Sequence, residues 1–381
     1  TLFMYLHLFI FIQNKKNKNV LISWVMTIFL GIEVYSVFIQ ALEMIDLNGV
    51  IVPGELKGVT ANRNITAFSI AMKIPFLLYL FDKLKNKIFI TSLIILLFFS
   101  ILDLSMISSR ASFVAVFLIF IGYVFVCFYK YYFFSDKYSV KKIVYKILFF
   151  LIPLIFSIIV NQFYFSSRGA DAVSRAGTIA INTSDDSISK RLRYYEDVLN
   201  HMSSNPIFGT GIGNWTIESI RYDRLDIDGY VVPYHAHSDF IQLGAELGFI
   251  GFFLYLFIFI TAIYYVFNIL FRSNLDNDNK TFSVILLISL GVYLIDANLN
   301  FPIARPQELA PWAMVMALIG FYGSKTINIS DNLKSKGILK NKKYIFSIVT
   351  LIFALPALSI SNKVYHSHKA QLIILNDFNN N

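Results

Sequence analysis

The sequence predicts an all-α polytopic membrane protein, one that crosses a lipid bilayer several times. Of its 381 residues, 56% are hydrophobic and only 15% are charged. A soluble domain of this length could not bury so much apolar surface, so the composition excludes that class. The apolar runs are far too long for the strands of a membrane barrel, whereas a helix satisfies its own backbone hydrogen bonds in hydrocarbon.

The positions of the apolar runs predict about nine full transmembrane helices after a partial first one. We expect them at 1–12 (partial), 20–41, 65–81, 88–103, 111–129, 143–160, 238–270, 282–299, 309–323 and 344–360. The chain then divides into N-terminal transmembrane helices (1–160), a large loop with amphipathic helices (161–236), C-terminal transmembrane helices (237–361) and a tail (362–381). Because the chain begins inside an apolar run, we expect earlier spans before Thr1.

The basic residues predict how the helices are oriented. Lysine and arginine number 33 against 24 aspartates and glutamates, an excess that in a membrane protein favours basic cytoplasmic loops and not nucleic-acid binding. Alternate short loops are rich in lysine, whereas the opposite short loops hold only Lys57, Arg63, Arg110 and Arg305. The positive-inside rule therefore places the large loop and the tail outside the cytoplasm.

Two residues within the predicted spans carry charged or reactive groups. Lys73 is costly in lipid, so we expect its side chain to face protein or water. Cys127 is the single cysteine, which excludes an internal disulfide. We interpret Cys127 as a small residue that faces lipid or a neighbouring helix.

Polar residues gather where the large loop meets the next apolar helix. His235 and His237 precede this helix, and one face of its first turns carries Asp239, Gln242 and Glu246 at spacings i, i+3 and i+7. A polar stripe on a membrane helix is costly unless it faces protein or a water-filled cavity, so it marks a candidate functional site. The alternative is that these turns simply lie at the membrane interface.

Glycines are concentrated in two places. One face of the same helix carries Gly244, Gly248 and Gly251, which would let another helix approach closely. Upstream, the stretch 207–215 holds Gly209, Gly211 and Gly213. No βαβ unit surrounds this stretch and its last glycine is misplaced for a dinucleotide-binding loop, so we interpret it as a tight turn.

The run from His237-Ser238 through Ile-Gln242 to Ala-Glu246-Leu-Gly-Phe-Ile-Gly251 resembles the signature of the O-antigen ligase and O-antigen polymerase superfamily. That signature usually has His-Asn where this chain has His-Ser. Members are bacterial inner-membrane glycosyltransferases that use undecaprenyl-pyrophosphate-linked sugars. The resemblance implies an active site on the periplasmic side and an inverting, metal-independent transfer.

Further matches concern arginines and an asparagine. An amphipathic helix at 187–202, followed by Asn205-Pro206 and the glycine-rich turn, resembles the arginine helix and turn of the superfamily. This implies Arg191 as the family's arginine, with Arg193 as the alternative. The turn around Arg110 resembles a Ser-Arg-Gly/Ala turn of the family; the alternative is an arginine that reaches the membrane interface. The stretch 58–64 resembles a Gly-x-x-x-Asn-x-Asn pattern, although Asn62 could simply cap a helix.

These residue types suit transfer from a lipid pyrophosphate. Arginines at 110 and 191 can hold phosphate oxygens through paired hydrogen bonds. His237 is the predicted general base, with His235, Gln242 and Glu246 as secondary candidates. The two histidines could ligate zinc, but the sequence shows no third ligand, and Asp226 and Asp228 have no evident partner, so we expect no metal and no other cofactor.

The sequence therefore predicts an inner-membrane glycosyltransferase that moves an undecaprenyl-pyrophosphate-linked glycan to an acceptor hydroxyl on the periplasmic face. The acceptor is left open between lipid A-core (a ligase), another repeat unit (a polymerase) and a protein serine. A transporter or flippase of lipid-linked sugars is the alternative from another class. Transporters tend to show internal repeats, and the sequence shows no such symmetry.

Overall fold

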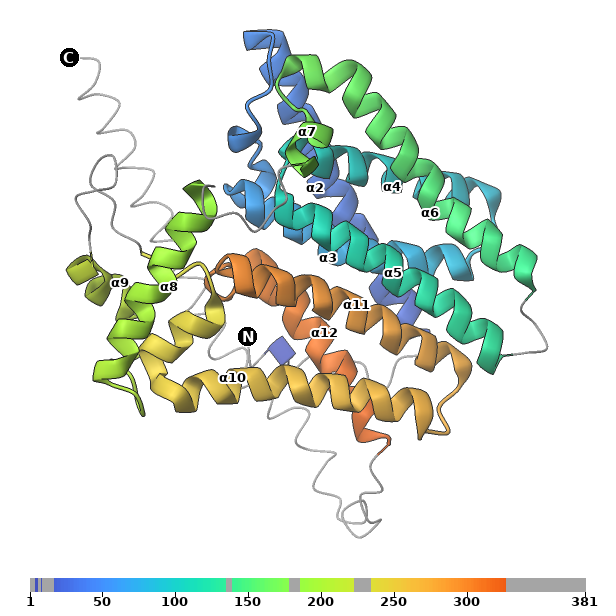
Figure 1. Cartoon of the computed structure of the whole chain (residues 1–381). Coiled ribbons are helices and arrows are strands. Elements are labelled where there is room, and N and C mark those ends of the chain that lie inside the picture. Colours follow the sequence, from blue (N-terminus) through green and yellow to red (C-terminus); the bar gives the residue numbers. More distant parts are fainter. Residues whose placement is uncertain are drawn as a thin grey trace, which may run out of the picture.

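The computed structural model describes residues 4–5, 8, 17–134, 139–177, 186–222 and 234–326. Within these ranges the chain forms helices and turns and no strand. The long helices lie side by side as a bundle (Figure 1). They are α2 (Lys18–Asn48), α3 (Arg63–Lys83), α4 (Lys87–Ile107), α5 (Arg110–Phe133), α6 (Val140–Val160), α10 (Asp239–Phe271), α11 (Asn277–Leu299) and α12 (Pro306–Ser324).

Shorter elements connect the long helices. The helices among them are α7 (Ala172–Gly177), α8 (Asp186–Ser204) and α9 (Trp215–Glu218). The remaining helical turns are η1 (Pro53–Glu55), η2 (Gly58–Thr60), η3 (Asn161–Phe165), η4 (Ser166–Arg168), η5 (Ser219–Tyr222) and η6 (Pro302–Ala304). The amphipathic helix expected at 187–202 is α8, and it ends at Ser204, just before Asn205-Pro206.

The multi-pass class predicted from the sequence is confirmed. Seven described helices are long and apolar enough to cross a membrane, namely α2 to α6, α10 and α11. Helix α12 lies where the sequence predicts a further span at 309–323. The expected spans at 1–12 and 344–360 and the tail at 362–381 fall almost entirely outside the described residues.

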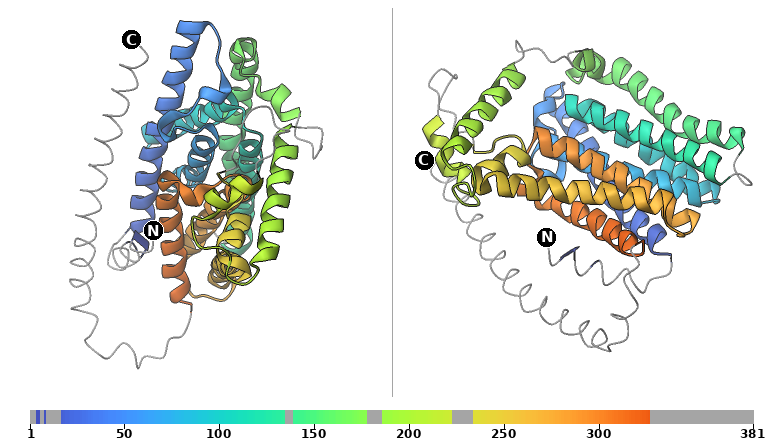
Figure 2. Two further views of the ribbon diagram at one scale, coloured as in Figure 1. Left: turned by 90° about the vertical axis from the view of Figure 1, so that its left-hand side faces the viewer. Right: turned by 60° about the horizontal axis from the view of Figure 1, so that its bottom comes forward.

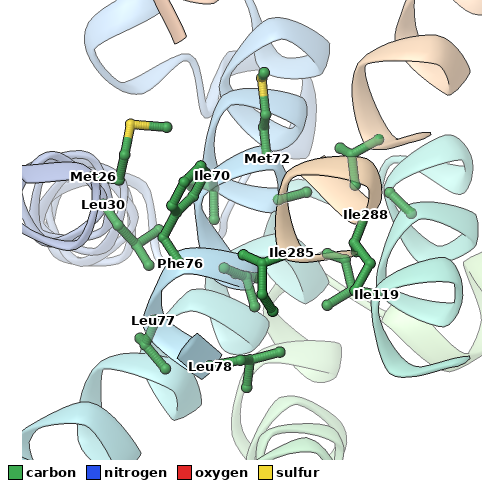
Figure 3. Close-up of a cluster of buried hydrophobic side chains, with 14 of the residues drawn as sticks. Met26, Leu30, Ile70, Met72, Phe76, Leu77, Leu78, Ile119, Ile285 and Ile288 are labelled. Carbon is green, nitrogen blue, oxygen red and sulfur yellow. The ribbon is translucent and has the colours of Figure 1, made fainter. Parts of the chain in front are cut away.

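Helix α3 forms the centre of the bundle. It packs against α2, α4, α5 and α11, and every residue from Ile65 to Phe81 is buried. Figure 3 shows its apolar side chains between those of α2, α5 and α11. A membrane helix that is surrounded by protein can carry polar groups, because neighbouring helices can satisfy them.

Lys73, which lies in this central helix, forms an ion pair inside the bundle. Its ammonium lies 2.9 Å from both carboxylate oxygens of Glu33 on α2 and 2.6 Å from Oγ of Ser69. The prediction that Lys73 faces protein is therefore confirmed, and Glu33 is the partner that the sequence could not identify. A buried charge is tolerated when it is paired and hydrogen-bonded in this way.

Helix α10 is broken at Gly248, where φ is 66° and ψ is −167°. The turn that follows α8 fills the break: the N–H of Phe249 donates to the carbonyl of Pro206 at 2.7 Å, and the N–H of Gly211 donates to the carbonyl of Glu246 at 2.7 Å. A Cβ on Gly248 would lie 2.2 Å from the carbonyl oxygen of Ile207. The glycine at this position is therefore required by both its backbone angle and its close contact.

This break corrects the prediction of one continuous helix whose glycine stripe receives another helix. At Gly244 a helix does approach, because a Cβ there would lie 2.8 Å from Cε of Met202 on α8. At Gly248 the neighbour is the tight turn instead. The turn itself was predicted correctly: Gly209, Gly211 and Gly213 all have positive φ.

One end of the bundle collects the polar elements. Because successive long helices run in opposite directions, the N-termini of α3, α5, α10 and α12 point to the same end. The short helices α7, α8 and α9 lie at this end as well (Figures 1 and 2). We call it the site end, because it holds the residues described next.

Candidate active site

Four arginines from four helices converge at the site end. Arg63 and Arg110 are the first residues of α3 and α5, Arg175 lies in α7 and Arg191 in α8. The positive charges of Arg110, Arg175 and Arg191 all act on Arg63. Arg63 and Arg175 line a cleft of about 420 Å³, together with Pro53, Gly54, Ser108, Gly169, Asp171 and Ser174. We call the four arginines, and not the other residues of the cleft, the arginine cluster.

The like charges of the arginine cluster repel one another. A cation at the first position of a helix, as at Arg63 and Arg110, also opposes the helix dipole. An anion reverses both terms, because it interacts favourably with helix N-termini and forms short charge-assisted hydrogen bonds with guanidinium groups. The cluster is therefore suited to bind a phosphate or pyrophosphate.

The sequence identified half of this cluster. Arg110 and Arg191 were predicted, and the structure brings them together. Arg63 had been counted only as a loop cation, and Arg175 had not been noticed, because α7 has six residues and too short a pattern to read. Arg191, and not the alternative Arg193, is the α8 arginine whose charge acts on both Arg63 and His237. Arg193 lies half-buried two residues further along α8.

Asn62 acts as a helix cap. Its side-chain oxygen accepts hydrogen bonds from the backbone N–H groups of Asn64, at 3.0 Å, and Ile65, at 3.3 Å. The capping interpretation of Asn62 is therefore observed directly. By fixing the first turn of α3, Asn62 also sets the position from which Arg63 projects.

His237 lies at the mouth of α10, next to the arginine cluster. Its backbone has a left-handed conformation with φ 54°, which is rare for a residue with a side chain and often marks functional sites. The hydroxyl of Tyr195 on α8 lies 3.1 Å from the backbone oxygen of His237 and 2.9 Å from that of Asn298. These contacts hold the His237 loop between α8 and α11.

The imidazole of His237 is packed between aromatic rings. The ring of Tyr194 is stacked on it at 5.8 Å, and the ring of Phe301 meets it edge-on at 5.4 Å. Its Nδ1 is buried and has no hydrogen-bond partner among the described residues. Burial, followed by the charges of Arg191 and His235, lowers the pKa of His237 to about 4, so the ring is neutral at physiological pH.

Of the two histidines, it is His235 that the predicted polar stripe on α10 contacts, through Gln242. The side chain of Gln242 contacts His235 and, on its other side, Glu246, while Asp239 accepts a hydrogen bond at 3.1 Å from the N–H of Ile303. The stripe is thus turned toward protein, as expected for a candidate site. The interface alternative does not describe it, because Asp239 and Glu246 are buried.

The loop between α11 and α12 contributes residues that the sequence did not single out. The guanidinium of Arg305 lies 4.9 Å from the centre of the Phe301 ring, and that ring contacts both histidines. Neither residue belongs to a recognisable motif. They reach the site only because α11 and α12 pack against α10.

A chain of side-chain hydrogen bonds joins the two halves of the site. Ser109, beside Arg110, donates to Asn64 at 3.2 Å, Asn64 donates to Asn300 at 3.3 Å, and Asn300 donates to Asp296 at 2.6 Å. Asn64 follows Arg63, and Asn300 precedes Phe301. These hydrogen bonds therefore link the start of α3, which carries Arg63, to the loop between α11 and α12, whose Phe301 contacts both histidines.

An apolar cavity of about 470 Å³ adjoins the arginine cluster. It lies between α4, α5 and α6 and is covered by α7, which contributes Ala172, Val173 and Ala176. Ser174 and Arg175 on the same short helix line the polar cleft. Helix α7 thus separates a charged cleft from an apolar cavity, and the combined shape suits an amphiphilic molecule with an anionic head.

Among the described residues, no group of three or more His, Cys, Asp or Glu side chains is arranged to hold a metal ion. Asp226 and Asp228, which the sequence had left without a partner, lie outside the described residues.

Fold and site together define a multi-pass membrane protein with a cationic, histidine-containing site at one end of its helix bundle. Residues 93–256 match the family of O-antigen ligases. The match supports the resemblance to the O-antigen ligase superfamily that the motifs indicate. No curated protein matches the chain. The matched stretch includes Arg110, Arg175, Arg191 and both histidines.

Proposed function

We propose that this protein is an O-antigen ligase-like glycosyltransferase. It would transfer an oligosaccharide or polysaccharide from undecaprenyl pyrophosphate to an acceptor hydroxyl on the periplasmic face of the bacterial inner membrane. The observation that carries this proposal is the convergence of the four arginines of the cluster beside His237. A general base beside a cluster of fixed cations is what transfer from a sugar pyrophosphate requires.

In this mechanism the arginine cluster holds the pyrophosphate. As the bond between the sugar carbon and the phosphate oxygen breaks, negative charge grows on that oxygen. Fixed cations therefore stabilise the transition state more than the ground state. His237, which is neutral, accepts the proton of the attacking hydroxyl. The new glycosidic bond forms on the opposite face of the sugar carbon, which inverts its configuration and releases the polyprenyl pyrophosphate.

The apolar cavity supports a lipid-linked donor. With the pyrophosphate at the arginine cluster, the polyprenyl chain would lie between α4, α5 and α6, beneath α7. A water-soluble sugar nucleotide would make no use of this cavity. The superfamily alternatives remain a polymerase, with a repeat unit as acceptor, and a protein O-oligosaccharyltransferase.

In vitro transfer tests the proposal. Purified protein is given one defined undecaprenyl-pyrophosphate-linked glycan and, in turn, lipid A-core, a second lipid-linked repeat unit and a serine-containing protein. We expect a product with one of these acceptors, and loss of that product in Arg191→Ala but not in the matched α8 variant Arg193→Ala. Movement of the donor across liposome bilayers without any glycosidic product would favour the flippase class and contradict this proposal.

The orientation is tested separately. In a Cys127→Ser background, cysteines replace Ser204 in α8 or Ser335 in a lysine-rich loop and are treated with an impermeant thiol reagent on intact spheroplasts. We expect labelling at 204 and protection at 335. The reverse pattern would place the site in the cytoplasm.

A further inference from the structure

The two histidines are held in different ways. The ring of His235 lies flat against Phe301, with ring centres 4.1 Å apart and an angle of 14° between the planes. Its Nδ1 lies 3.4 Å from Oε1 of Gln242. His237 has neither contact: it meets Phe301 edge-on, and its Nδ1 has no partner among the described residues. His235 is therefore the more firmly oriented ring.

The contacts of Gln242 determine which nitrogen of His235 carries the proton. Oε1 of Gln242 also accepts the backbone N–H of Ala236 at 3.2 Å, and Nε2 of Gln242 donates to Oε1 of Glu246 at 3.2 Å. These two contacts fix the orientation of the amide. Since an amide oxygen only accepts, Nδ1 of His235 must donate. In the neutral ring, Nε2 is then the unprotonated nitrogen and can accept a hydrogen bond.

We infer that His235, oriented by Gln242 and Glu246, is the residue that binds the acceptor sugar through a hydroxyl next to the one that reacts. The inference rests on the proposed glycosyl transfer and divides the work between the two histidines. His237, beside Arg191, would take the proton at the donor, and His235 would hold the acceptor in place. A sugar offers several hydroxyls on one ring, whereas a serine side chain offers one. The arrangement therefore favours a glycan acceptor over a protein serine.

The charges around His235 keep its ring able to accept a hydrogen bond. Burial lowers the pKa of His235, the hydrogen bond to Gln242 partly opposes this, Arg305 lowers the pKa further and Glu246 raises it. His237 is the remaining titratable neighbour, and it is itself neutral. On acidification His235 becomes protonated at Nε2 and can no longer accept, so the KM for the acceptor should rise while the KM for the donor does not.

The experiment compares acceptor KM and kcat in His235→Ala, His235→Gln and His237→Ala with one lipid-linked donor. Loss of one hydrogen bond predicts that His235→Ala raises the acceptor KM about threefold to tenfold. His235→Gln should partly restore it, because its side-chain oxygen can accept in place of Nε2. With glutamine, which does not titrate, the pH dependence of the acceptor KM should disappear. His237→Ala should lower kcat instead.

Gln242→Glu supplies a second, independent test. A carboxylate facing Nδ1–H raises the pKa of His235. The rise in acceptor KM on acidification should then begin at a higher pH than in the wild type. His201 offers a matched control: it is a buried histidine of α8 whose Nε2 lies 3.2 Å from Oγ1 of Thr210 and whose ring packs against Trp215 and Tyr222. His201→Ala should leave the acceptor KM of the folded fraction unchanged.

Binding of the acceptor oligosaccharide without donor separates the two ways in which this picture can fail. If His235→Ala leaves both this binding and the acceptor KM unchanged while transfer proceeds, the role of His235 is wrong and the proposed function stands. If the wild type binds the oligosaccharide in a His235-dependent way but transfers nothing from any lipid-linked donor, the proposed function is wrong and the acceptor site stands.

Discussion

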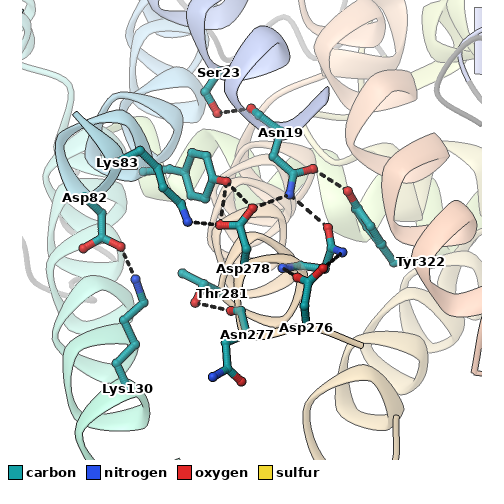
Figure 4. A network of polar contacts seen from close by, with 12 residues as sticks. Asn19, Ser23, Asp82, Lys83, Lys130, Asp276, Asn277, Asp278, Thr281 and Tyr322 are labelled. Carbon is teal, nitrogen blue, oxygen red and sulfur yellow. Dashed lines mark hydrogen bonds and ion pairs between the residues drawn. The ribbon is translucent and has the colours of Figure 1, made fainter. Parts of the chain in front are cut away.

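Two groups of cations, one at each end of the helix bundle, have different charged neighbours. At the end away from the site, cations are matched with carboxylates: Asp82 pairs with Lys130, and Lys83 pairs with Asp278 (Figure 4). Asp82 also pairs with Lys146. Asp278 also accepts a hydrogen bond from Tyr79 at 2.9 Å. At the site end, arginines from four helices face one another, and the largest charge effects on Arg63 come from other arginines.

This difference separates a structural use of charge from a functional one. The paired end joins α3, α5, α6 and α11 through contacts that lower the energy of the free protein. The arginines of the cluster act on one another as like charges, and an anion bound among them would be attracted to all of them. We therefore expect substitutions at the two ends to affect different quantities, transfer at one and stability at the other.

The largest effect is expected at the arginine cluster. Arg110→Ala and Arg191→Ala should each nearly abolish transfer in protein that still inserts into the membrane, because each removes a fixed cation at the developing phosphate charge. Lysine at either position should restore activity only in part, since an ammonium cannot form the paired hydrogen bonds of a guanidinium. Normal transfer by Arg110→Ala would mean that this arginine merely reaches the membrane interface.

The second largest effect is expected for His237→Ala. Its kcat should fall by about a hundredfold to ten-thousandfold, the usual cost of a missing general base. The structure also changes the expected pH dependence. A base must be neutral, and burial lowers the pKa of His237 to about 4, so loss of kcat on acidification should begin near that pH and not at the ordinary imidazole value. A kcat that falls about fourfold between about pH 8 and pH 6 would instead point to a base with an unshifted imidazole pKa.

The paired end should respond in stability and not in transfer. Asp82→Asn leaves Lys130 and Lys146 without their carboxylate, and breaking a buried ion pair typically costs about 3 to 5 kcal/mol. We expect the variant to unfold at a lower temperature in detergent, with an unchanged kcat for the folded fraction. The comparison between the two ends would fail if Asp82→Asn lowered kcat as strongly as the arginine substitutions do.

The sequence indicated those site residues that lie within a recognisable local motif. It did not indicate those that join the site only through the packing of distant helices. The apolar runs fixed the helices, and the motifs around Arg110, Arg191 and His237 were readable because neighbouring residues carry the pattern. Arg63 and Arg305 looked like ordinary loop cations. Their role follows only from which helix ends meet in space, as does the pairing of Gln242 with His235.

Asn62 has two interpretations, as a helix cap and as a residue of the site. Of the substitutions considered, those of Asn62 should have the smallest effect. It resembles a family motif, yet the structure shows it capping α3 through the N–H groups of Asn64 and Ile65. Asn62→Ala should lower stability by about 1 kcal/mol, the typical value of a lost N-cap. Asn62→Asp should recover most of that loss, because aspartate caps equally well.

Transfer measured per folded molecule distinguishes the two interpretations of Asn62. If Asn62 acts only as a cap, Asn62→Ala should have a donor KM close to that of the wild type, since Arg63 keeps its place once α3 has formed. An aspartate at this position would also bring a negative charge next to the arginine cluster. If Asn62→Ala raised the donor KM tenfold when only folded molecules are counted, Asn62 would itself contact the pyrophosphate.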